Sequence, residues 1–175
     1  MIYAREGENM RVFRAFVRYT AAQLLSLFVN IMLSAAGGTL ISVICLVCTA
    51  SVLICVLADF GIKEASADYK KEKRSESGAS VRGMFGAAAA VTAVPLISRV
   101  LLCVSRGGVF EFYGLFKLLD PSFLRLYNFI ESSASATDIS GGELAAILPV
   151  AAVPACALLL SYAAGMKSLR RQDIT

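Results

Sequence analysis

The chain has 175 residues and a net charge of +4, and 57% of its residues are hydrophobic while only 17% are charged. Soluble domains average about 45–50% apolar and about 25% charged residues, and one of this length could not bury so much apolar surface in a single core. A bilayer can cover that surface. The composition therefore excludes an ordinary soluble domain and favours an integral membrane protein, with the lipid bilayer as its first partner.

The first apolar segment is long enough for two membrane-spanning helices. Residues 21–62 contain one acidic residue, Asp59, before Lys63 begins a charged stretch. About 20 helical residues cross a bilayer core, so this segment predicts two spans, near 15–36 and 39–60. Gly37 and Gly38 lie between them and predict a tight turn, because glycine accepts positive φ without steric cost.

Charged residues then interrupt the pattern and predict a solvated loop over 61–82. The third span is expected near 83–104, with a kink at Pro95, because proline removes a helical hydrogen bond. This span carries a face of small residues that permits close packing, either inside the bundle or against a partner. The face consists of Gly83, Gly86, Ala87 and Ala90.

The outer segment, 105–142, is mixed in character. Asp120 and Pro121 predict a helix start, with Asp as N-cap and Pro at the first helical position. Polar residues at spacing three up to Ile130 predict an amphipathic helix that lies in the membrane interface. A re-entrant hairpin of two half-helices is the alternative and would need protein cover on its backbone. Ser140 and Glu143 fit a capping box that opens a fourth span, near 143–165.

The basic residues indicate the orientation. Of the 17, four lie in the N-terminal segment, six in the 61–82 loop and three in the C-terminal tail. An even number of spans places all of these on one side, which the positive-inside rule makes the cytoplasm. We therefore predict an all-α fold, a four-transmembrane-helix bundle with an interfacial helix between the third and fourth spans. It forms one domain, 1–175, in the cell membrane, with both termini cytoplasmic.

The same charge distribution explains the basic balance without nucleic acid, so no nucleic-acid partner is predicted. Arg11, Arg14 and Arg18 follow spacings of three and four before the first span. Such a basic face can lie on the anionic inner leaflet, with each charge contributing about 1 kcal/mol. We therefore expect these three arginines to contact anionic lipid.

A polar stripe runs along the first span, and the second span carries a shorter one. Their residues share one side of each helix at spacings of three and four. The stripes predict interhelical hydrogen bonds, which are common between membrane helices, or a polar cavity for a small ligand or solute. The candidate residues are Tyr19, Gln23, Ser26, Asn30 and Ser34 on the first span, and Ser42, Cys45 and Thr49 on the second.

Arg99 is the one basic residue deep in a predicted span, and intramembrane charge is usually paired or functional. It lies about five residues from the outer end, so we expect its side chain to snorkel towards the outer interface. Glu111 or Asp120 could pair with it there.

The sequence points to no catalytic chemistry. There is no histidine, and the five cysteines lie in apolar stretches without the spacing of a metal site. No metal, cofactor or enzymatic activity is therefore expected. The favoured hypothesis is a non-enzymatic subunit that packs against another membrane protein or a second copy of itself. The alternative is a small-solute carrier or channel component that uses the polar face of the first span.

Overall fold

The computed structural model describes residues 2–35, 37–74, 81–108, 110–132 and 135–173, with backbone alone for 2–6 and 82. Over these residues the fold is all-helical and contains no strand. Four helical rods are long and apolar enough to cross a membrane. They are α1 (Ile2–Ser34), α2 (Thr39–Lys73), α3 (Val81–Ser105) and a composite rod of α6 (Gly141–Ile147), the 3₁₀ helix η3 (Leu148–Ala152) and α7 (Val153–Gln172).

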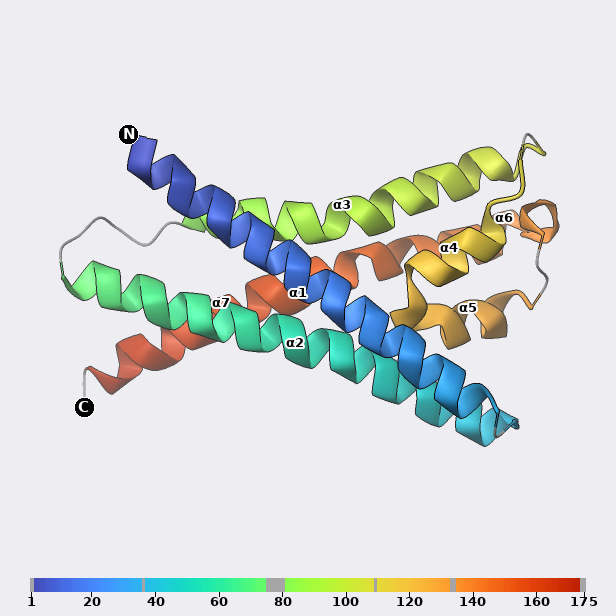
Figure 1. Cartoon of the computed structure of the whole chain (residues 1–175), viewed down its shortest axis with the longest axis horizontal. Coiled ribbons are helices and arrows are strands. Elements are labelled where there is room, and N and C mark those ends of the chain that lie inside the picture. Colours follow the sequence, from blue (N-terminus) through green and yellow to red (C-terminus); the bar gives the residue numbers. More distant parts are fainter. Residues whose placement is uncertain (1, 36, 75–80, 109, 133–134, 174–175) are drawn as a thin grey trace.

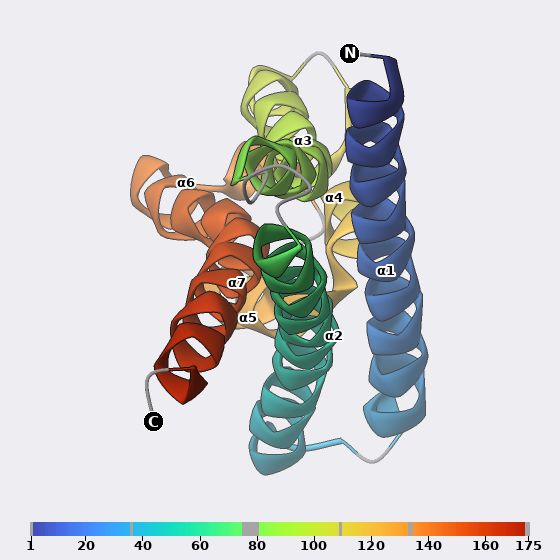
Figure 2. The same ribbon diagram turned by 90° about the vertical axis from the view of Figure 1, so that its left-hand side faces the viewer.

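The four rods lie antiparallel in sequence, so their ends gather at two opposite ends of the bundle. The N-terminal ends of α1 and α3 and the C-terminal ends of α2 and α7 lie at one end of the bundle, on the left of Figure 1. The turn between α1 and α2 lies at the other end, together with α4 (Tyr113–Leu119), α5 (Leu124–Ile130) and α6. The three basic segments of the sequence therefore lie at the same end. Turning the molecule shows α1 on one side of α2 and α7 on the other (Figure 2).

The predicted turn between the first two helices is confirmed, since Gly37 and Gly38 have φ of 64° and 89°. The helices themselves are longer than predicted. The loop expected over 61–82 is wrong up to Lys73, because α2 continues through it. Its charged residues Glu64 and Asp68 are buried against the arginines of α1. At 1.5 Å per residue, the 35 residues of α2 span roughly 52 Å, well beyond a hydrocarbon core of roughly 30 Å.

Small residues bring α2 and α7 into close contact. A Cβ built on Gly61 would lie 2.8 Å from the Leu158 carbonyl oxygen, and one on Gly165 would lie 3.0 Å from the Ala65 Cβ. These two glycines let the backbones approach, as small residues do between membrane helices. The small residues predicted on the third span divide between two faces. Gly83 and Ala87 are buried, whereas Gly86 is exposed and Ala90 is half-buried.

The two proline-containing helices behave differently. α3 remains helical across Pro95, whereas Pro149 and Pro154 stand at the starts of η3 and α7. The fourth rod therefore changes to 3₁₀ geometry between its prolines. The capping box predicted from Ser140 and Glu143 is confirmed at the N-terminus of α6.

Residues 113–130 form a short helical hairpin. α4 runs inward and α5 runs back, with η1 (Pro121–Phe123) at the tip between them (Figure 1). The tip bonds Gln23 of α1 and Thr49 of α2, which lie 11 residues before the end of α1 and 10 residues after the start of α2, or about 15 Å. The chain is helical from Pro121 to Ile130, and the tip has the protein cover that the re-entrant alternative requires, while the interfacial location of this helix stays a prediction.

Candidate functional site

The tip of the hairpin is the centre of a buried polar cluster. Arg99 of α3 is 1% exposed, and its Nη2 lies 3.1 Å from Oδ2 of Asp120. The same nitrogen donates to the Tyr127 hydroxyl at 2.8 Å, and that hydroxyl donates to Asp120 Oδ2 at 2.6 Å. The other guanidinium nitrogens donate to the carbonyls of Pro95 and Ile147. Arg99 therefore joins α3, the hairpin and the fourth rod through one side chain.

The α1 stripe supplies the second half of the cluster. Gln23 Nε2 donates to Asp120 Oδ1 at 3.2 Å, and its Oε1 accepts from the Ser122 hydroxyl at 2.8 Å and the Ser122 amide at 3.2 Å. Asn30 Nδ2 donates to the Pro121 carbonyl at 2.8 Å. The hydroxyl of Ser122 also lies 3.0 Å from that of Ser26.

The α2 stripe completes the contacts of the tip. The Thr49 hydroxyl lies 2.9 Å from the Ser122 carbonyl, and the thiol of Cys45 lies 3.2 Å from Asn30 Oδ1. The carbonyls of Pro121 and Ser122 and the amide of Ser122 thus all meet side chains of the first two helices. Pro121 has no amide hydrogen to satisfy. An unpaired backbone group in an apolar interior costs several kcal/mol, so these contacts allow the backbone of the hairpin tip to lie inside the bundle.

Three members of the predicted stripes lie outside this network. Ser34 and Ser42 donate to the carbonyls of Ile31 and Gly38 on their own helices. Tyr19 is 2% exposed, and its hydroxyl has no hydrogen-bond partner among the residues described. The stripe residues Gln23, Ser26 and Asn30 are all buried, in keeping with the face that their spacing marks.

Two expectations for the ion pair need correction. Arg99 does not snorkel, because Asp120 and two carbonyls hold its guanidinium in the interior. Glu111 is not its partner, since its carboxylate accepts from the Ser135 hydroxyl and the Ala136 amide. Asp120 precedes Pro121 at a helix start as predicted, but it makes no side-chain cap because its oxygens bind Arg99, Tyr127 and Gln23.

A second buried cluster, which the sequence did not suggest, lies towards the other end. Arg11 of α1 is 6% exposed and bonds Glu64 at 2.8 Å and Asp68 at 2.5 Å, both on α2. The Tyr162 hydroxyl of α7 donates to Asp68 at 2.8 Å, and the half-exposed Arg14 reaches Glu64 at 3.2 Å. Three long helices are thereby tied together.

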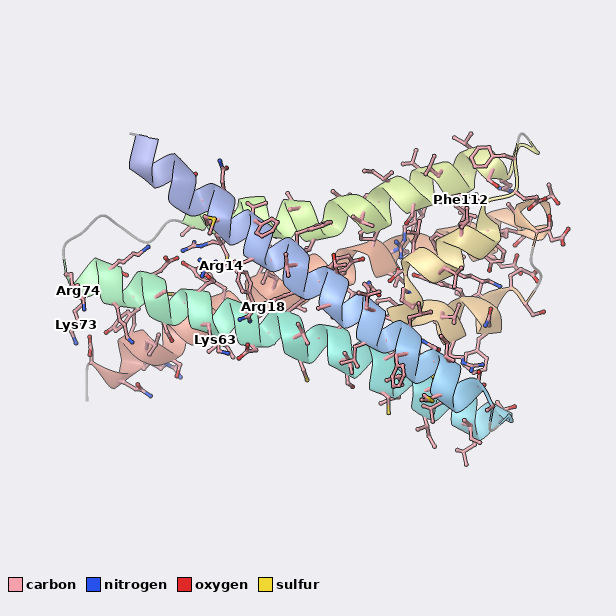
Figure 3. All side chains as sticks on the ribbon, in the orientation of Figure 1. Arg14, Arg18, Lys63, Lys73, Arg74 and Phe112 are labelled. Carbon is pink, nitrogen blue, oxygen red and sulfur yellow. The ribbon has the colours of Figure 1, made fainter. Side chains whose placement is uncertain are left out.

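These ion pairs change the expectation of anionic lipid at Arg11, Arg14 and Arg18. Arg11 is buried and pairs with two carboxylates of α2. Arg14 and Arg18 each hold one ion pair and stay partly exposed, and for them the contact remains a prediction. Figure 3 shows both on the half of the molecule that also carries Lys63, Lys73 and Arg74, with Phe112 at the opposite end.

The C-terminus of the fourth rod is fastened to α2 by exposed pairs. Lys73 lies 2.9 Å from Asp173, which also accepts from the Tyr69 hydroxyl, and Arg170 lies 3.0 Å from Glu72. The donors Tyr69 and Lys73 lower the pKa of Asp173. Exposed pairs of this kind contribute little stability.

In the hairpin cluster the hydrogen-bonding groups of Asp120 are already occupied by other side chains of the protein. Asp120 is held by three donors, and the cluster contains no group of three His, Cys, Asp or Glu side chains; none occurs elsewhere among the described residues. All five cysteines are free, with Cys45 buried and the others exposed. Searches against protein-family models, curated proteins and solved structures find no match for this chain.

Proposed function

We propose that this chain is a non-enzymatic, multi-pass protein of the cell membrane that packs against a second membrane protein. Four apolar helices of sufficient length support the membrane location. The common end of the three basic segments supports cytoplasmic termini, by the positive-inside rule. In this topology the α4–α5 hairpin enters the bundle from the outer side.

The observation that carries the proposal is an apolar groove between α1 and α3. Its volume is about 520 Å³, and α3 contributes the small side chains of Ala90 and Ala93 to its lining. Phe13 of α1 stands at its edge and is 62% exposed. Small residues let a partner helix approach closely, and large neighbours then pack around it. The groove is completed by Asn9, Val12, Phe16 and Val94.

We propose that the chain is not an enzyme because its buried carboxylates are already bound to other side chains. Asp120 is fully bound, and Glu64 and Asp68 both engage Arg11. A general acid or base needs a titratable group within reach of a substrate. No such group lines the α1–α3 groove, whose one polar side chain is Asn9.

Site-directed photocrosslinking in native membranes tests the partner. A photoreactive amino acid at Phe13 should give one discrete adduct, while the same group at Leu160, 70% exposed on α7, should give none. An adduct of twice the 18.6 kDa chain mass identifies a second copy, and another mass identifies a different partner. Ala93→Phe should abolish the adduct. Equal crosslinking at both positions would contradict the proposal.

Cysteine labelling in a cysteine-free background tests the orientation. Thr137→Cys lies in the outer segment and Lys70→Cys near the inner end of α2, and both positions are exposed. A membrane-impermeant thiol reagent should label position 137 alone in intact cells. Labelling of position 70 alone would reverse the topology.

A small-solute carrier or channel is the second candidate, and the re-entrant hairpin favours it. Its polar tip rests on Gln23, Asn30 and Thr49, a surface that displacement of the hairpin would expose. Solute uptake into proteoliposomes that Asn30→Leu abolishes would support this function. Uptake that the substitution leaves unchanged would count against it.

A further inference from the structure

A basic pocket lies on the surface of α7 near its C-terminal end. Its volume is about 460 Å³, and all of its lining residues are exposed and none is acidic. They are Ala164, Lys167, Ser168, Arg171 and Gln172. Figure 2 shows this end of α7 at the edge of the bundle. The pocket is therefore accessible to a ligand that approaches from outside the protein.

The two cations of the pocket have no counter-charge in the described part of the chain. Lys167 and Arg171 stand four residues apart and so share one side of α7. Neither side chain forms an ion pair or hydrogen bond with a described residue. The acidic residues Glu72 and Asp173, which tie the opposite side of α7 to α2, are bound to other cations. The two free positive charges also outweigh the roughly half negative charge of a helix C-terminus.

The position of the pocket along the fourth rod matches the headgroup layer of a bilayer. The rod carries no charged residue between Glu143 and Lys167, which follows 24 residues later. Those residues rise about 36 Å, slightly more than a hydrocarbon core of roughly 30 Å, so Lys167 lies just beyond the core. The rise from Lys167 to Arg171 is about 6 Å, and the headgroup layer adds about 5–7 Å on each side. In the proposed topology this layer is the cytoplasmic one.

We propose that the pocket binds the phosphate of an anionic glycerophospholipid, with Lys167 and Arg171 as its cationic contacts. A guanidinium offers several N–H donors to phosphate oxygens, the ammonium group adds a second charge, and the Ser168 hydroxyl can donate beside them. A headgroup with an amine would bring a third positive charge to the two cations, so the lipid is one without an amine. The site rests on the membrane location proposed above, and it is separate from the α1–α3 groove and from the lipid contact predicted at Arg14 and Arg18.

Fluorescence quenching in phosphatidylcholine nanodiscs tests the lipid contact. The chain has no tryptophan, so Leu160→Trp introduces a single reporter. Leu160 is 70% exposed and lies one turn before Ala164, on the membrane side of the pocket. Phosphatidylglycerol with brominated acyl chains should quench this reporter at a lower lipid fraction than brominated phosphatidylcholine does. Lys167→Gln or Arg171→Gln should each raise the required fraction about fivefold, the effect of one basic residue at a membrane surface.

A matched variant separates the pocket from general surface charge. Lys70→Gln, Lys71→Gln removes two exposed charges of α2 outside the pocket and should leave the preference for phosphatidylglycerol unchanged. The proposal is overturned if this variant lowers the preference as much as Lys167→Gln, Arg171→Gln does, or if the two brominated lipids quench alike. Release of the lipid by inorganic phosphate would identify a free phosphate as the occupant and would also overturn it. Quenching by neither lipid would contradict the membrane location itself, so the failure of each proposal has its own signature.

Discussion

The two buried ion clusters compensate buried charge in different ways. At the hairpin, one arginine meets one carboxylate, and neutral donors from Tyr127 and Gln23 complete the shell of Asp120. At the other end, Arg11 meets two carboxylates, and the half-exposed Arg14 shares the extra negative charge. The hairpin cluster has no access to water, whereas the Arg11 cluster opens to solvent through Arg14. Loss of the arginine should therefore cost more free energy of unfolding in the closed hairpin cluster than in the solvent-accessible Arg11 cluster.

Among the substitutions that test this comparison, removing Arg99 should lower the free energy of unfolding the most. Arg99→Met leaves the Asp120 carboxylate buried without its cation, which typically costs about 3–5 kcal/mol. The free energy of unfolding in detergent should fall by that amount. The exposed Arg106→Met is the control and should stay within about 0.5 kcal/mol. The double variant Arg99→Met, Asp120→Leu should regain much of the loss, and failure to do so would show that packing dominates over charge at this site.

Removing Arg11 should destabilise the protein less than removing Arg99. In Arg11→Met the carboxylates of Glu64 and Asp68 lose their buried partner, but Arg14 still reaches Glu64 and water can enter beside it. We expect a loss of about 2–3 kcal/mol, below the range for a fully closed pair. Chemical unfolding of the two variants under identical conditions measures the difference. Equal losses would mean that the Arg11 cluster is as closed as the hairpin cluster.

The close packing of α2 against α7 at Gly61 and Gly165 helps to form the Arg11 cluster, because it brings Tyr162 to Asp68. Gly61→Ala should cost about 1–3 kcal/mol, since its Cβ would press on the Leu158 carbonyl and separate the helices. Gly86→Ala is the matched control. Its Cβ would meet Val12 at an ordinary 3.5 Å, so thermal unfolding should be unchanged or slightly delayed. A harmless Gly61→Ala would show that α7 can shift without breaking the cluster.

The smallest effect should come from the ends of the polar stripes. Thr49→Val leaves the Ser122 carbonyl of the hairpin tip without its donor and should cost about 1–2 kcal/mol. Ser42→Ala removes a hydroxyl that bonds only its own helix and should cost less than about 0.5 kcal/mol. Melting temperatures of the two variants, recorded side by side, measure the contrast. A larger loss for Ser42→Ala would place the cluster nearer the outer end of α2.

Helical spacing was sufficient to predict which side of α1 is buried. Gln23 and Asn30 share a face seven residues apart, and an amide in hydrocarbon needs a partner, so the direction followed from periodicity and solvation alone. The partners did not follow from it. Pro121 and Ser122 lie in a segment whose approach to α1 depends on how the hairpin folds back, and local periodicity carries no information about that.

The charged stretch over 61–82 is a case in which the sequence pattern led to a wrong prediction. Glu64 and Asp68 stand four residues apart among lysines, and a dense run of both signs usually marks a solvated loop. Spacing of four also places two carboxylates on one face of a helix. The deciding fact is tertiary, because Arg11 lies 53 residues earlier and approaches only once α1 and α2 have packed as neighbours.

The order of residues around Arg99 has a consequence for biosynthesis in the proposed topology. Arg99 precedes its counter-ion by 21 residues, so α3 emerges from the ribosome before Asp120. An unpaired arginine at the centre of an inserting helix costs about 2.5–3.5 kcal/mol on the translocon scale, and Arg99, which lies six residues before the end of α3, carries a smaller cost. The apolar remainder of α3 must offset this penalty until the hairpin arrives. Arrival of the hairpin then acts as a late locking step, which commits three already inserted helices to a single arrangement.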